Sequence, residues 1–375
     1  MNLMINMPDN KTNLDKIRFS NNFDFLRLLG AFLVILSHSF DLTGNGTMEP
    51  LFSLTGWINS GDLGVLIFFV ISGYLIPSSW LRKPNFSGFF KNRILRTVPG
   101  LFVVAVITIF IIGPLVTIIP ISDYFQNPMT WLYIRIVLIY YSGMAYLPGV
   151  FVNNVFPNAV NGSLWILPVL FTMYILVAIL GYFGFLKKRI LLLIITVFLA
   201  LTSLISQTNL YAISLLNIIY QNHYVTYLFS DNLSFTIYFM IGVLFYLFRD
   251  KIKFDLKIFI LLFVLLVLSF KTNYGILMIY LAIPYILLYI AFAHIPYLNK
   301  VGKFGDFSYG LYIFAFPIQQ CVEFFMPGIS PSGMFLLSSL IVIPISILSY
   351  KLVESKALSL KNIQLRKTIF KAIKI

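Results

Sequence analysis

Two polar side chains interrupt the first long apolar run of the sequence, FDFLRLLGAFLVILSHSFDL, which extends from Phe23 to Leu42. Arg27 lies near the start of this run, and His38 follows eleven positions later. At 100° per residue this spacing is three turns plus about 20°, so both side chains lie on one helix face, roughly 16 Å apart along the axis. An ionisable residue near mid-membrane costs about 2.5–3.5 kcal/mol on insertion scales and usually faces a cavity or a partner. The shared face therefore predicts a site.

Each of these residues also has a purely structural interpretation. Arg27 would act as an interfacial anchor that extends its guanidinium to the inner membrane surface. His38 would make a hydrogen bond that packs one helix on another. Because histidine titrates near neutrality in its unperturbed state, it also suits a general base that takes a proton from a hydroxyl group.

The second apolar run contains a pair of small residues in the stretch LGVLIFFVISGYLI. Ser72 and Gly73 thin this helix and let another backbone approach closely. Packing is the better interpretation for Gly73. Ser72 equally suits a bond to a ligand or to its own backbone.

Two arginines precede the third apolar run in the stretch FFKNRILRTVPG. Arg93 and Arg96 are three residues apart, so they are neighbours on one helical face. A pair of guanidinium groups suits phosphate recognition. The alternative is ordinary positive charge that keeps a loop on the inner side of the membrane.

The elements that position these residues are predicted to be membrane helices. Apolar residues make up 59% of the 375 residues and charged residues only 11%, which is more apolar surface than a water-soluble domain can bury. We therefore expect an all-α, polytopic membrane protein with about ten transmembrane helices. The apolar runs able to cross about 30 Å of hydrocarbon are 25–40, 63–80, 98–119, 164–185, 190–206, 229–248, 258–270, 274–293, 307–325 and 333–350.

The net charge of +14 would suit nucleic acid, but the distribution of the charge argues against such a partner. Ten spans place both termini on one side of the membrane. Of the 27 lysines and arginines, only Arg135 and Lys271 then fall on the other side. The positive-inside rule therefore predicts that both termini are cytoplasmic.

The chain is predicted to hold one transmembrane domain, 23–355, after a cytoplasmic N-terminal segment, 1–22. The basic tail, 356–375, is expected to lie on the anionic inner leaflet. Segment 120–163 fits a half-buried or re-entrant cover better than an eleventh span, because an odd number of spans would reverse the later charge pattern. A single cysteine, Cys321, and three scattered histidines predict no metal site.

The order of motifs along the chain resembles the acyltransferase 3 family of integral-membrane O-acyltransferases. The motifs are FDFLRLLGAFLVILSHSF, FFVISGYL, RILRTVP, NGSLWILP and FSYGLYIFAFP, and the resemblance runs from about Asp24 to Glu354. Its most specific element is an arginine, ten residues and a histidine, met here by Arg27 and His38. The family has ten or so membrane helices and transfers an acyl group, commonly acetyl from cytoplasmic acetyl-CoA, to a hydroxyl of a bacterial surface glycan or a related acceptor.

The resemblance implies a role for each candidate residue. His38 would be the catalytic base, and Arg27 would be a donor-side or structural partner. Arg93 and Arg96 would bind the phosphates of coenzyme A, with Ser72 as a further donor-binding residue. Acyl-CoA would thus be a substrate, and no bound cofactor is expected.

On the acceptor side, Ser163 and Trp165 match the SLW element of the family and would bind the glycan or lipid-linked sugar. Glu354 matches a glutamate near the C-terminus of the family. The resemblance further implies a multi-pass protein of the bacterial inner membrane, in contact with the lipid bilayer.

One departure from the family pattern concerns an acid. Where the family usually has glutamate after SLWxLPx, this chain has Leu170, and Asp41 or Glu323 would have to replace it. An inactive relative that acts as a scaffold in surface-polymer assembly is therefore one alternative function. A transporter or flippase is another, although such proteins tend to carry internal repeats and more acidic groups within their spans.

Overall fold

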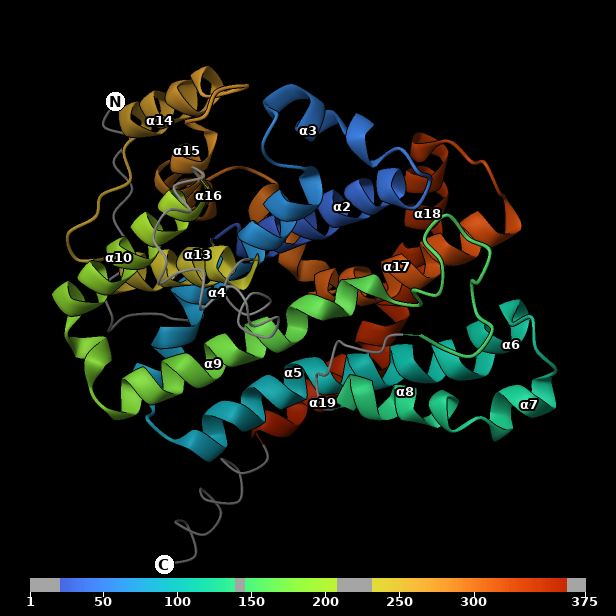
Figure 1. Cartoon of the computed structure of the whole chain (residues 1–375). Helices are drawn as coiled ribbons and strands as arrows, with labels where there is room; N and C mark the ends of the chain where they lie inside the picture. The colour runs from blue at the N-terminus through green and yellow to red at the C-terminus, as the bar shows by residue number, and fades with distance from the viewer. Residues whose placement is uncertain (1–20, 139–145, 208–230, 363–375) are drawn as a thin grey trace, which may run out of the picture. The chain divides into compact units, whose positions relative to one another are not determined.

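The computed structural model describes residues 21–138, 146–207 and 231–362 (Figure 1). Within these ranges the protein is built of helices and contains no β-strand, which confirms the predicted all-α class. Most of the N-terminal segment (1–20) and the end of the basic tail (363–375) lie outside the described residues.

Each of the ten predicted apolar runs coincides, as far as it is described, with helical structure (Figure 1). The elements are α2 (Phe23–Asp41), α4 (Ser60–Arg82), α5 (Phe86–Ile107) continued by the π-helical turn η2 (Thr108–Ile112) and α6 (Gly113–Val116), α9 (Ile166–Tyr182), α10 (Arg189–Gln207), α13 (Asp231–Leu247), α14 (Leu256–Leu268), α15 (Gly275–Leu281) with α16 (Ile283–Phe292), α17 (Ser308–Phe325) and α18 (Pro331–Ser349).

Six helical stretches of the described chain are long and apolar enough to cross a membrane, which makes the chain a multi-pass membrane protein. Helix α17 is not among them, because its apolar sequence is interrupted by Gln319, Gln320 and Glu323. The six stretches are 23–41, 60–82, 86–116, 162–182, 275–292 and 331–359.

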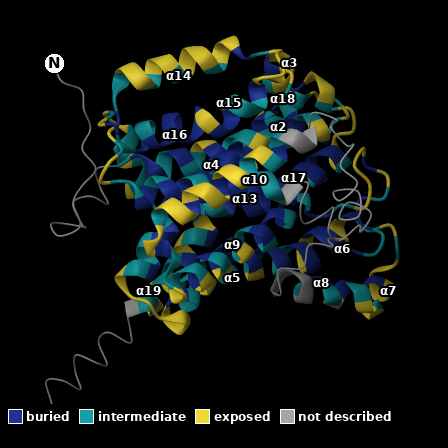
Figure 2. Ribbon diagram, turned by 60° about the vertical axis from the view of Figure 1, so that its left-hand side comes forward, coloured by how far each residue is buried: buried dark blue, intermediate teal, exposed yellow. Residues whose placement is uncertain are grey.

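The surface of α14 shows which solvent these helices meet. None of its residues is buried. Its exposed residues, yellow on the ribbon in Figure 2, are almost all apolar. A helix exposed to water would instead carry polar residues on its outer face. This surface therefore matches lipid. The exposed apolar residues of α14 are Ile258, Ile260, Leu261, Phe263, Val264, Leu265, Val267 and Leu268.

The chain divides into two compact units, each assembled from separate stretches. The first unit comprises residues 1–30, 50–84 and 171–304. The second comprises residues 31–49, 85–170 and 305–375. Helix α2 thus contributes its first turns to one unit and its last turns to the other.

In the first unit, α4 and α13 pack backbone against backbone. A Cβ at Gly73 would lie 2.0 Å from the carbonyl oxygen of Phe239, and a Cβ at Gly242 would lie 2.3 Å from that of Val70. No side chain fits at either position, so the two glycines set the distance between the helices. This confirms the packing interpretation of Gly73.

In the second unit, the start of segment 120–163 folds back on the preceding helix. It forms α7 (Ile121–Gln126) and α8 (Pro128–Leu138). The Tyr124 hydroxyl donates to the carbonyl of Ile109 at 3.1 Å. A Cβ at Gly113 would lie 2.0 Å from that hydroxyl. Over its described part, the predicted cover therefore begins as two short helices beside the third long helical stretch, while residues 139–145 lie outside the description.

Candidate active site

Helix α2 carries both residues of the arginine–histidine pattern. It is one helix from Phe23 to Asp41, so Arg27 and His38 have the helical spacing that the sequence predicts. The start of this helix is fixed by Asn22, whose amide donates to the carbonyls of Ile290 and Ala293 at 2.7 Å each.

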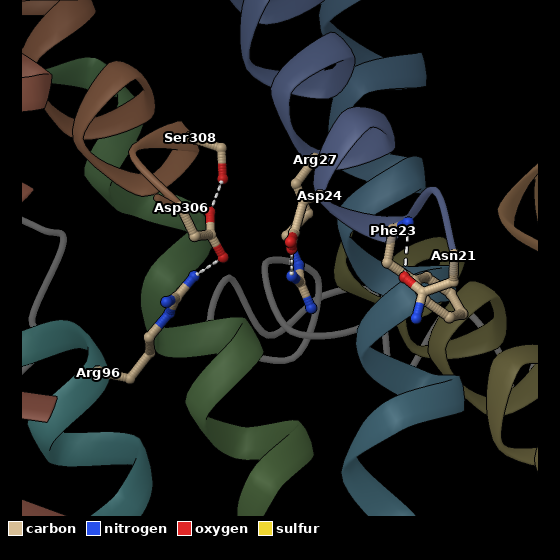
Figure 3. A network of polar contacts seen from close by, with 7 residues as sticks. All are labelled: Asn21, Phe23, Asp24, Arg27, Arg96, Asp306 and Ser308. Carbon is tan, nitrogen blue, oxygen red and sulfur yellow. Dashed lines mark hydrogen bonds and ion pairs between the residues drawn. The ribbon is translucent and has the colours of Figure 1, made fainter. Parts of the chain in front are cut away.

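In the first unit, Arg27 binds a carboxylate one turn earlier on its own helix. Its Nη1 donates to Asp24 Oδ1 at 2.8 Å (Figure 3). Asp24 packs on the backbone at Gly302, where a Cβ would lie 2.3 Å from its Oδ2. Ser72, on α4 of the same unit, is half-buried. The roles of Arg27 and Ser72 in donor binding stay predictions.

In the second unit, His38 packs against an aromatic ring of α17. The imidazole and the Phe316 ring meet at 84°, with their centroids 5.1 Å apart. His38 is half-buried, whereas its Nδ1 is buried and has no hydrogen-bond partner in the described chain. Neither Asp41 nor Glu323 therefore orients the imidazole through Nδ1. Glu323 interacts instead with the backbone of Val155.

The turn of α2 around His38 is held by an amide of α17. Gln319 Nε2 donates to the carbonyl of Ile35 at 2.9 Å and to Ser39 Oγ at 2.8 Å. Ser39 Oγ in turn donates to Ile35 O at 2.7 Å. These bonds tie the backbone before His38 and the side chain that follows it to α17. Gln319 was not predicted from the sequence, although two successive amides inside an apolar helix were a usable signal.

The two predicted donor-binding arginines both lie on α5. Arg96 forms an ion pair with Asp306, whose other oxygen accepts a 2.6 Å hydrogen bond from Ser308 (Figure 3). The guanidinium of Arg93 lies over the ring of Phe89, 5.2 Å from its centroid. Asp306 was not singled out from the sequence. An acid directly before an apolar helix, on the side where the basic residues gather, would have pointed to it.

A second acid lies beside the same part of α5. Glu354 ends the π-helical turn η7 (Tyr350–Glu354), is 1% exposed and accepts a 2.9 Å hydrogen bond from Ser349. A Cβ at Gly100 would lie 3.3 Å from Glu354 Oε1 and 2.9 Å from the Tyr309 ring. Arg96 is therefore part of a local network with acidic members, and its charge is partly balanced by the protein itself.

The predicted acceptor-binding residues lie on the short 3-10 helix η4 (Gly162–Trp165). The side-chain amide of Asn161 donates to the carbonyl of Ile313 at 2.9 Å, and the Tyr312 hydroxyl donates to the carbonyl of Ser163. A Cβ at Gly162 would lie 2.7 Å from the Phe316 ring. The contacts of Phe316 thus bring η4 and His38 together within the second unit.

These features define a helical membrane protein in which a helix of spanning length carries a half-buried histidine, whose Nδ1 has no hydrogen-bond partner among the described residues. Comparison with known proteins identifies its class: residues 20–351 match the acyltransferase domain of the acyltransferase 3 family. The chain belongs to this family and is an acyltransferase, which confirms the resemblance and the expected enzyme class.

Two relatives are similar to the chain. An O-acetyl transferase of Shigella phage Sf6 is 30% identical over 349 residues, which are 91% of this chain and 96% of the relative. Nodulation protein 10 of Rhizobium leguminosarum bv. viciae is 40% identical over 90 residues, which are 22% of each chain. No solved structure matches the chain.

Proposed function

We propose that this enzyme transfers an acetyl group from acetyl-CoA, bound from the cytoplasmic side, to a hydroxyl group of a surface polysaccharide or lipid-linked sugar. The observation that carries the proposal is the imidazole of His38, whose buried Nδ1 has no hydrogen-bond partner in the described chain. Membership of the family and similarity to an O-acetyl transferase support an acetyl donor.

In the proposed reaction, the acceptor hydroxyl oxygen attacks the carbonyl carbon of the thioester. His38 accepts the hydroxyl proton as the new C–O bond forms. The C–S bond then breaks, and the coenzyme A sulphur leaves as a thiolate that recovers the proton from His38. Positioned proton transfer of this kind typically contributes about 10²–10⁴-fold in rate.

Donor binding by the second unit is assigned to the basic residues on α5. Arg93 and Arg96 both lie on this helix, and each guanidinium suits charge-assisted hydrogen bonds to the phosphates of coenzyme A. Arg27 and Ser72 keep the donor-side roles that the family pattern implies.

The proposed topology has ten membrane spans and places both termini in the cytoplasm, in the inner membrane of a bacterium. It is supported by the helical structure found at each of the ten apolar runs and by the six stretches of full spanning length. The bias of lysine and arginine toward one set of loops supports the orientation.

One observation favours a second function, a scaffold in surface-polymer assembly. Leu170 lies half-buried on α9 at the position where the family usually has glutamate. Mass spectrometry of surface glycans from a deletion strain and its complemented partner separates the two functions. The enzyme predicts loss of a defined acyl substituent with the polymer otherwise intact. The scaffold predicts loss of the polymer or no change in its acylation.

A further inference from the structure

Among the buried polar atoms of the second unit that have no hydrogen-bond partner in the described chain, four belong to residues near Phe316. They are His38 Nδ1, Asn161 Oδ1, Ser163 Oγ and Gln319 Oε1. Asn161 and Ser163 are each 1% exposed, and Gln319 is fully buried. A buried polar atom without a partner costs about 1–3 kcal/mol, so several such atoms in one place point to a ligand that supplies the missing bonds.

One ring, that of Phe316, connects the residues that carry these atoms. The ring is in edge contact with His38 and touches Gly162, which separates Asn161 from Ser163. Gln319 follows Phe316 by three residues on α17 and therefore lies on the same helix face. It also bonds Ser39, the neighbour of His38 in the chain. The four unpaired atoms thus belong to His38, to the two chain neighbours of Gly162 and to a residue about one helical turn from Phe316.

The orientation of both amides follows from their other bonds. Asn161 donates its NH₂ to the carbonyl of Ile313, and Gln319 donates its NH₂ to the carbonyl of Ile35. Turning either amide over would place oxygen against oxygen, so the unpaired atoms are the amide oxygens. Amide oxygens only accept hydrogen bonds, and Ser163 Oγ can do either.

A set dominated by acceptors discriminates between the two substrates. The developing oxyanion of the thioester needs N–H or O–H donors, which amide oxygens cannot supply. Sugar hydroxyls are donors and match these oxygens. We propose that Asn161, Ser163 and Gln319 form the hydroxyl-binding part of the acceptor site, where they hold a polyhydroxylated ring beside His38. This inference rests on the proposed function and names the chemistry by which its acceptor is recognised.

Ser163→Ala is the sharpest test, because the serine hydroxyl makes no hydrogen bond within the described protein and its removal leaves no protein partner unsatisfied. The assay uses the purified full-length chain, radiolabelled acetyl-CoA, and the methyl glycosides of glucose, galactose and mannose as acceptor probes. Loss of one hydrogen bond predicts a rise of about three- to tenfold in KM for the glycoside, with an unchanged KM for acetyl-CoA. The thermal unfolding temperature should be unchanged or raised.

Asn161→Ala provides a second variant, with the same expected split between the two KM values. Ser346→Ala is the matched control: its hydroxyl is also buried and unpaired, but it lies on α18 against Gly310, so both KM values should stay at wild-type levels. Unchanged glycoside KM in both site variants, or equal rises for glycoside and acetyl-CoA, would overturn the inference. A wild-type enzyme that acetylates none of the glycosides would instead refute the proposed sugar acceptor, and the inference would fail with it.

Discussion

The rings of His38 and Phe316 meet nearly at right angles, with their centroids 5.1 Å apart. Edge-to-face contacts of aromatic rings contribute about 0.5–1.5 kcal/mol beyond the area they bury. No acidic residue of the described chain hydrogen-bonds Nδ1 of His38. The imidazole is held instead by the ring contact and by the Gln319 bonds to Ile35 and Ser39, which fix its turn of the helix.

Replacing Phe316 by leucine should therefore loosen His38 without altering its chemistry. We expect kcat to fall by about tenfold, the upper end of such a contact, while KM for acetyl-CoA stays unchanged. Phe324→Leu, on the same helix, is the control, because Phe324 contacts Phe151 and Phe325 instead. Wild-type kcat in a well-folded Phe316→Leu enzyme would show that the ring contact does not position the base.

Substitution of either arginine of α5 should weaken donor binding. Arg93→Gln removes a cation over the Phe89 ring and should raise KM for acetyl-CoA by about tenfold, since charge-assisted hydrogen bonds contribute roughly 1.5–3 kcal/mol. Arg96→Gln removes the partner of Asp306 and should also lower the thermal unfolding temperature. Acetyl-CoA titrations of both variants measure the loss of donor binding, and thermal unfolding curves measure the loss of stability.

Arg82→Gln serves as the control for these arginines, because Arg82 bonds the backbone of its own helix. It should leave acetyl-CoA binding and stability near wild type. Equal acetyl-CoA affinity in the wild type and in Arg93→Gln would reassign this arginine to membrane topology alone.

The ten-span topology predicts the sidedness of four positions. Reporter fusions at Lys188 and Lys253 should indicate the cytoplasm, whereas fusions at Asn158 and Ser330 should indicate the opposite side. Paired enzymatic reporters, each active on only one side, measure this directly. A cytoplasmic signal at Asn158 would require a further crossing after the third long helical stretch and would refute the topology.

The crossing of α4 and α13 should tolerate no side chain. Gly73→Ala places a methyl group 2.0 Å from the Phe239 carbonyl oxygen, so the helices must separate, at about 1–3 kcal/mol for overpacking of this kind. We expect a lower unfolding temperature and lower accumulation. Gly88→Ala, on α5, is the control for space, because a Cβ there would meet only the Asn85 side chain, at an ordinary contact distance of 3.4 Å.

The helices were predictable because the bilayer imposes a simple rule on sequence. A run of apolar residues that must hydrogen-bond its own backbone forms a helix, so the ten runs and their helices agree closely. The spacing of Arg27 and His38 also followed from helix geometry. The packing role of Gly73 could be inferred because two small residues in succession within an apolar helix let the backbone of a neighbouring helix approach closely.

Tertiary partners were not predictable in the same way. Asp306, Phe316 and Gln319 lie more than 200 residues from Arg96 or His38 in sequence, and no local pattern specifies such long-range pairs. Phe316 is one of 38 phenylalanines, so its contact with the imidazole has no signature of its own. Nothing in the sequence singled out Asn161, and only its bond to Ile313 shows which of its atoms has no partner in the described chain.

The central claim is that His38 removes the proton from the acceptor hydroxyl, and substitution by glutamine tests it most directly. Glutamine keeps a hydrogen-bonding side chain of similar reach but does not accept a proton at neutral pH. His294→Gln is the control, because His294 is exposed after α16 and should leave activity unchanged.

The decisive measurement is acetyl transfer by purified His38→Gln enzyme, at matched amounts of folded protein, with radiolabelled acetyl-CoA and the glycan acceptor. The account predicts a loss of about 10²–10⁴-fold in kcat, with acetyl-CoA binding retained. Acetyl transfer at the wild-type rate by folded His38→Gln protein would contradict the account and leave His38 as a packing residue.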